Sequence, residues 1–227
     1  MILTSSDEMI LKAVCWIIVI VECFVVAIVL YKYLKEKSES EYSKKISIGY
    51  VFFAVGYAIC RIFFLISDFE QIENDTSRFY VIVVILGYIS VISAILWLAH
   101  TIEFYLMQSR RKITTKLLII MLSIVVVMFI FATIYYDSEL TMNIARYSVY
   151  IISGIAGFIV FFFYLSLVFK TVGAVRTRFF VNFIGICLIF AGMVFDSEYL
   201  QYLLPVWLPP LFAGVGFIMF SLAQIKK

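Results

Sequence analysis

The sequence is poor in helix-breaking residues and in charge. It contains three prolines and ten glycines in 227 residues, and Asp, Glu, Lys and Arg together account for only 15%. A soluble domain is about one-quarter charged and about half apolar. Here 64% of the chain is apolar and the mean hydropathy is +1.08. Water cannot solvate a surface of that composition, so the apolar excess must face lipid.

Several motifs of known chemistry are also absent. The sequence has no glycine-rich nucleotide loop, no Gly-x-Ser-x-Gly nucleophile and no paired aspartates within an apolar run. Its single histidine, His100, excludes a His-Glu-x-x-His zinc motif and bis-histidine haem ligation by one chain. The four cysteines lie inside apolar runs without metal-ligand spacing, which favours simple packing. We therefore expect no cofactor and no metal.

Long apolar runs fill most of the chain. A membrane-spanning helix needs about 20 mostly apolar residues, and seven runs come close to that length. They cover residues 9–33, 46–67, 79–107, 113–136, 144–169, 179–195 and 203–225. The sixth run is the shortest. The sequence predicts an all-α membrane protein, a single domain of seven transmembrane helices over residues 1–227, with no soluble domain.

The first run does not have the pattern of a cleaved signal peptide. It is preceded by Asp7 and Glu8, whereas a signal peptide carries basic residues there, and it is longer than a signal-peptide core. We expect it to remain in the mature protein.

Basic residues gather on alternate connections between the runs. Fourteen of the 18 Lys and Arg follow the first, third, fifth and seventh runs: Lys32, Lys35, Lys37, Lys44, Lys45, Arg110, Arg111, Lys112, Lys116, Lys170, Arg176, Arg178, Lys226 and Lys227. The other connections are acidic, ending with Asp196 and Glu198. Because Lys and Arg are enriched in cytoplasmic loops, the N-terminus is predicted outside and the C-terminus in the cytoplasm.

The same loops suggest partners. Basic clusters beside membrane spans are typical of contacts with anionic lipid headgroups, at roughly 1 kcal/mol per residue, and nucleic-acid binding is not expected. A cytoplasmic protein partner is a further expectation, because no output domain follows the last run. We expect the chain to lie in the cell membrane.

Small residues and prolines indicate how the helices pack. Gly49 and Gly56 in the second run, like Gly185 and Gly192 in the sixth, are seven residues apart and share a face where helices can approach closely. The fourth run has almost no small or polar residue, so we expect the most lipid-exposed helix there. Prolines in the outer part of the seventh run predict a helix that is kinked or starts late, near Pro209.

The runs also permit an internal repeat. The second and sixth both end in acidic residues, and the third and seventh end in similar segments, 95–100 and 219–224. A plan of 3+1+3 helices, with the fourth run joining two parallel triplets, would resemble the repeats of some membrane transporters.

Ionisable residues inside apolar runs are candidate functional residues because each is costly to bury in lipid. Glu22 in the first run and Arg61 in the second could form an ion pair, either as a structural contact or as a ligand or proton site. His100 and Glu103 share a face near the inner end of the third run, as interfacial groups or as the seed of a catalytic site. Asp196 lies at the outer end of the sixth run. It could be a solvated residue at a helix end or part of an outward-facing site.

Two weaker expectations concern single polar residues. Trp16, Trp97 and Trp207 fall towards the ends of runs, as in the aromatic belts of membrane proteins. Asn182, inside the sixth run, is expected to form a hydrogen bond with a neighbouring helix.

Three functions fit these features. A small-ligand or lipid sensor, a receptor-like subunit that signals through a partner, explains the lack of catalytic motifs. A small transporter with an intramembrane site near Glu22 and Arg61 fits the possible repeat and the prolines. A lipid-modifying enzyme would need more than His100 and Glu103. Retinal chemistry is excluded, because the seventh run contains no lysine to form a Schiff base.

Overall fold

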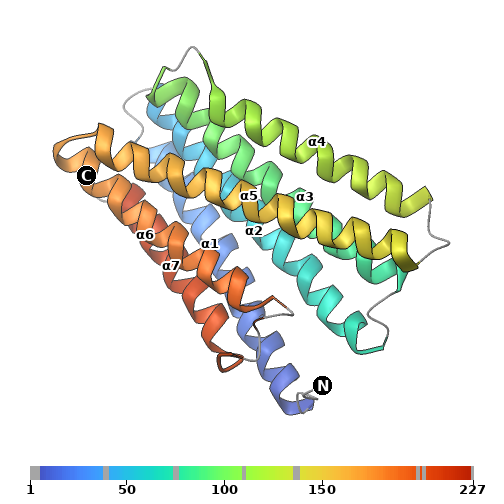
Figure 1. Cartoon of the computed structure of the whole chain (residues 1–227). Coiled ribbons are helices and arrows are strands. Elements are labelled where there is room, and N and C mark those ends of the chain that lie inside the picture. The colour runs from blue at the N-terminus through green and yellow to red at the C-terminus, as the bar shows by residue number, and fades with distance from the viewer. Residues whose placement is uncertain are drawn as a thin grey trace. The chain divides into compact units, whose positions relative to one another are not determined.

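The structure is a computed structural model, and it describes residues 6–37, 41–73, 77–108, 111–134, 139–197, 200 and 203–225. Within these residues the chain forms seven α-helices and one π-helical turn (Figure 1). They are α1 (Ser6–Lys37), α2 (Glu41–Glu73), α3 (Arg78–Thr101), the π-helical turn η1 (Ile102–Leu106), α4 (Ile113–Ile134), α5 (Glu139–Lys170), α6 (Gly173–Phe195) and α7 (Leu208–Ile225). Glu198 lies outside the described residues.

Six of these helices, α1 to α6, are long and apolar enough to cross a bilayer. α7 is shorter, with 18 residues. At 1.5 Å per residue it is about 27 Å long, close to the roughly 30 Å of a hydrocarbon core. The chain is a polytopic α-helical membrane protein. The count of seven spans, the outward N-terminus and the repeat stay predictions.

Two helix starts differ from the apolar runs. α6 begins at Gly173, whose positive φ of 61° suits glycine, and not near residue 179. Its first turns therefore include the polar residues Arg176 and Arg178, which the apolar pattern of the sequence places in the connection before the sixth run. α7 begins at Leu208, with Pro209 and Pro210 in its first turn, where a missing N–H costs no helical hydrogen bond. The late start is confirmed, and α7 replaces the sixth helix as the shortest.

The helices form two compact units. Unit 1 comprises Met1–Glu36 and Phe161–Lys227, and so contains α1, the C-terminal part of α5, α6 and α7. Unit 2 comprises Lys37–Val160 and contains α2, α3, η1, α4 and the N-terminal part of α5. The prediction of a single domain stays a prediction.

In unit 1, α6 and α7 lie side by side with their backbones in contact (Figure 1). A Cβ atom added to Gly185 would lie 2.8 Å from the carbonyl oxygen of Gly216, and one added to Gly216 would lie 2.6 Å from that of Gly185. Only residues without a side chain allow this approach. Nearby, the Gln224 side-chain amide donates to Asn182 Oδ1 at 3.3 Å, which confirms the predicted interhelical bond.

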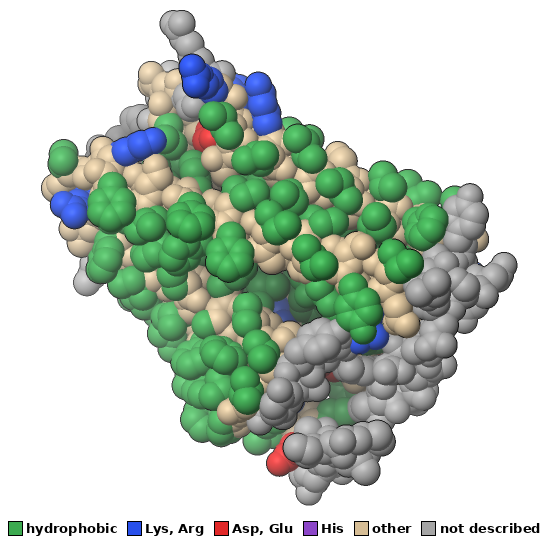
Figure 2. All heavy atoms as spheres, in the orientation of Figure 1, with side chains coloured by type: hydrophobic (Ala, Val, Ile, Leu, Met, Phe, Trp, Pro, Cys, Tyr) green, Lys and Arg blue, Asp and Glu red, His purple; other side chains and the backbone are tan. Residues whose placement is uncertain are grey.

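In unit 2, α2 packs along α3, and α4 is the least buried helix. A Cβ on Gly56 would collide with the side chain of Ala94. Only 17% of the apolar stretch of α4 is buried, against 56% for α3, so the predicted lipid-exposed helix is confirmed. Figure 2 shows apolar side chains over α4 along its length, with Lys and Arg gathered near one end.

Candidate functional site

Glu22 lies in unit 1, inside α1, and faces α7. Its Oε2 would lie 2.8 Å from a Cβ atom added to Gly214, so the carboxylate reaches α7 at a point that has no side chain. Its Oε1 is buried and has no hydrogen-bond partner among the described residues. A carboxyl group in such apolar surroundings is costly unless it gains a proton, a cation or a donor.

Asp196 ends α6 in unit 1 and joins it to α1. Its Oδ1 accepts a hydrogen bond from the Trp16 indole at 3.1 Å and lies 3.2 Å from Lys12 Nζ. The Asp196 side chain is only 7% exposed, so the expected solvated helix end is wrong. Trp16 is 1% exposed, and its assignment to an interfacial belt is also wrong, whereas Trp97 and Trp207 are exposed. The sequence did not reveal this ion pair because its members are 184 residues apart.

Glu103 and His100 do not form a joint site. Glu103, 4% exposed in η1, accepts hydrogen bonds from the backbone N–H groups of Thr114 and Thr115 and from the Thr115 hydroxyl, at 2.7–3.0 Å. It therefore caps the N-terminus of α4. The expectation of an interfacial carboxylate stays a prediction. The His100 ring packs on Phe104, 5.8 Å between centroids. No group of three or more potential metal ligands occurs among the described residues.

Arg61 is buried in α2 of unit 2, with 2% of its surface exposed. Its guanidinium carbon lies 5.4 Å from the centroid of the Phe64 ring. Cation–π contacts of this kind are worth roughly 2 kcal/mol when desolvated. Glu22 belongs to unit 1 and Arg61 to unit 2. Their ion pair therefore stays a prediction.

A second buried arginine extends this arrangement across unit 2. Arg146 in α5 is 7% exposed, its Nε donates to the Tyr150 hydroxyl at 3.3 Å, and its guanidinium lies 5.2 Å from the Tyr80 ring. Ring contacts link the two arginines, with Phe64 on Tyr88 at 5.0 Å and Tyr88 on Tyr150 at 5.6 Å. We name this set the arginine–aromatic cluster: Arg61, Phe64, Tyr80, Tyr88, Arg146 and Tyr150.

Sequence reasoning missed Arg146. It is the third residue of the apolar run 144–169, a position that assigns it to the outer end of the span and not to the interior. α5 begins earlier, at Glu139, so that Arg146 lies two turns inside the helix. The available signal was the aromatic spacing, because Tyr150 follows four residues later, at a position that can contact a helical arginine.

The cluster brings together chemistry suited to an anion. Guanidinium groups bind carboxylate and phosphate through a planar fork of N–H donors, and tyrosine hydroxyl groups add further donors. All six residues lie in α2, α3 and α5, on rigid helices and not on loops. Comparisons of the chain with protein families, with curated proteins and with solved structures find no match.

Proposed function

We propose that this protein is a receptor-like sensor of the cell membrane that binds a small anionic ligand at the arginine–aromatic cluster of unit 2. The observation that carries this proposal is the burial of two guanidinium groups, Arg61 and Arg146, on one connected set of rings. Burying a cation in a membrane protein is costly, and such residues commonly mark a functional pathway or site.

The position of the cluster supports access from one side of the membrane. Tyr80 lies in the first turn of α3, and Arg146 lies in the N-terminal part of α5. Both lie toward the ends of helices that the charge pattern predicts to face outward. A ligand would enter from outside, and the basic loops at the opposite helix ends would dock a cytoplasmic protein that carries the signal onward.

The test measures the unfolding temperature of the full chain in phosphatidylcholine nanodiscs with succinate, inorganic phosphate or sulfate, against chloride at equal ionic strength. A ligand at one hundred times its Kd stabilises the folded state by about 2.7 kcal/mol. We expect at least one anion to raise the unfolding temperature of the wild type. Arg61→Gln and Arg146→Gln should abolish that rise.

Arg78→Gln is the matched control. Arg78 lies in the same unit, is exposed, and donates from Nη2 to the carbonyl of Thr133 at 2.6 Å. The variant removes the same charge from the same end of the helices while leaving the cluster intact. If no anion stabilises the wild type, or if Arg78→Gln loses the response as fully as the cluster variants, the sensor proposal is wrong.

A second candidate function, a small transporter, is favoured by Glu22, whose Oε1 is buried without a hydrogen-bond partner among the described residues and whose Oε2 lies next to Gly214. Carboxyl groups of this kind carry protons or cations in membrane transporters. Proteoliposomes with an internal pH dye distinguish the two functions. Proton movement driven by an anion gradient, and lost in Glu22→Gln, would indicate transport, whereas anion binding without movement would indicate sensing.

A further inference from the structure

A second cationic and aromatic site lies at the opposite end of unit 2, where α2 begins and α3 passes through η1 toward α4. The ammonium group of Lys112 lies 4.2 Å from the centroid of the Phe104 ring. That of Lys45 lies 5.0 Å from the Tyr105 ring. The two rings contact each other at 4.7 Å in an edge-to-face arrangement. Two cations, Lys45 of α2 and Lys112 just before α4, thus lie on one pair of rings. We name these four residues the lysine–aromatic cluster.

The backbone around this cluster is unusual and well supported. Lys112 has a φ of 44°, in the left-handed region that non-glycine residues rarely occupy. Residues kept in such conformations cluster at functional sites. The three hydrogen bonds from Thr114 and Thr115 to Glu103 hold the start of α4 directly after Lys112. The backbone that follows Lys112 is therefore held in place by hydrogen bonds.

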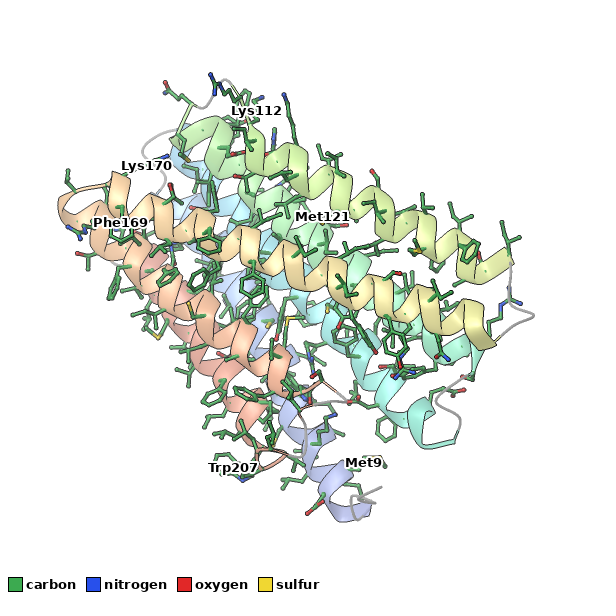
Figure 3. The ribbon with its side chains drawn as sticks, in the orientation of Figure 1. Met9, Lys112, Met121, Phe169, Lys170 and Trp207 are labelled. Carbon is green, nitrogen blue, oxygen red and sulfur yellow. The ribbon has the colours of Figure 1, made fainter. Side chains whose placement is uncertain are left out.

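The cluster also lies where membrane and water meet. The apolar stretch of α2 begins at Lys44, that of α3 with η1 ends at Tyr105, and that of α4 begins at Ile113. Figure 3 labels Lys112 at the start of α4, with Met121 further along the same helix. Phe104 is 44% exposed, and Ile113 and Leu117 at the start of α4 are exposed as well. The cluster thus combines two cations with an exposed ring, and exposed apolar residues follow Lys112 in the sequence.

From this arrangement we propose that the lysine–aromatic cluster binds the headgroup of an anionic phospholipid. The phosphate group lies between Lys45 and Lys112, and one acyl chain follows the exposed face of α4. Charge complementarity at the ring-held ammonium groups selects an anionic lipid over a zwitterionic one. The exposed apolar residues at the start of α4 favour a lipid over a soluble phosphate ester. This site is separate from the arginine–aromatic cluster and does not depend on the sensor proposal.

The test counts lipids bound to the full chain in detergent by native mass spectrometry, with phosphatidylglycerol and phosphatidylcholine as probes. The wild type should bind phosphatidylglycerol more tightly. Lys45→Gln and Lys112→Gln should each weaken it about fivefold, the affinity that corresponds to one basic residue near a membrane surface. Excess inorganic phosphate should not displace the lipid; displacement would indicate a free phosphate site and would overturn the proposal.

Two further variants distinguish lipid binding at a defined site from non-specific electrostatic attraction. Lys116→Gln removes an exposed lysine from the first turn of α4 and should weaken phosphatidylglycerol binding clearly less than Lys112→Gln does. Phe104→Ala keeps every charge but removes the ring under Lys112, and should weaken binding several-fold. Equal losses in Lys116→Gln and Lys112→Gln, or full binding by Phe104→Ala, would refute the proposal.

The variant Lys112→Gly tests whether a loss of phosphatidylglycerol binding is caused by misfolding. Glycine adopts the left-handed conformation without strain, so this variant should unfold at the wild-type temperature or above it. It should nevertheless lose phosphatidylglycerol binding as Lys112→Gln does. Retention of binding by this variant would show that the ammonium group is not part of the site.

Discussion

The two units of this protein keep polar groups inside an apolar fold in different ways. In unit 1, Asp196 is satisfied by Lys12 and Trp16, Asn182 by Gln224, and the helix backbones touch at glycine. In unit 2, Arg61 and Arg146 lie on aromatic rings. A polar partner fixes a group in one geometry. The rings add cation–π contacts to the hydrogen bond from Arg146 to Tyr150, and they gather two guanidinium groups in one cluster. This concentration of cationic donors is why we propose ligand recognition in unit 2.

The largest expected effect comes from filling the backbone contact of unit 1. In Gly216→Ala, the new Cβ would meet the Gly185 carbonyl at 2.6 Å, and the two helices must separate. We expect a loss of about 3 kcal/mol in the free energy of unfolding, measured by denaturation in mixed micelles.

Two alanine variants sharpen this comparison. In Gly87→Ala of unit 2, the nearest atom is on the Phe64 ring at 2.6 Å, and a side chain yields more easily than a backbone, so we expect about 1 kcal/mol. Gly154→Ala meets nothing within 4 Å and should be neutral or stabilising. Equal losses at Gly87 and Gly216 would contradict the distinction between the units.

A somewhat smaller effect is expected from Asp196→Asn. The substitution leaves the Lys12 ammonium largely buried without its counter-charge, at a cost of about 2 kcal/mol. The double variant Lys12→Met with Asp196→Leu should recover most of that loss, because it removes both charges together. Unfolding curves of the single and double variants measure the coupling. A double variant as unstable as the sum of the single changes would show that the pair contributes nothing.

In unit 2, the buried acid Glu103 accepts hydrogen bonds from backbone N–H groups at the start of α4. Glu103→Ala removes the cap of α4 and should cost about 1 kcal/mol. Glu103→Gln keeps a side-chain oxygen that can accept one of these bonds and should cost less. Hydrogen exchange at the first amides of α4 reports the change directly. Unchanged exchange in Glu103→Ala would show that the cap does not hold this end of the helix.

Among the variants that remove a contact, the smallest loss of stability should come from Tyr150→Phe. The hydrogen bond from Arg146 Nε to the hydroxyl is long, at 3.3 Å, so its loss should cost about 0.5 kcal/mol. Tyr150→Leu removes the ring as well and should cost more. If the two variants were equally stable, the hydroxyl and not the ring would hold Arg146, and the contrast between the units would fail.

Hydropathy predicted much of the fold and little of the site. Length and apolarity were enough to place six spanning helices, and the lack of small residues in residues 113–134 was enough to identify the peripheral one. Hydropathy does not separate side chains that face lipid from those that face the interior, since both are apolar. The burial of Trp16 and Arg146 was therefore not visible. Glu103 was found as a candidate, but its role depends on a loop geometry that no apolar pattern encodes.

The left-handed backbone at Lys112 also constrains how this position can evolve. Glycine, asparagine and aspartate are the residues that tolerate such a φ most readily, and none of them carries a positive charge. Drift toward lower strain at this position would therefore remove the ammonium group in a single step. In related sequences, lysine or arginine here would mark lineages that keep the lipid contact, and glycine or asparagine would mark those that have given it up.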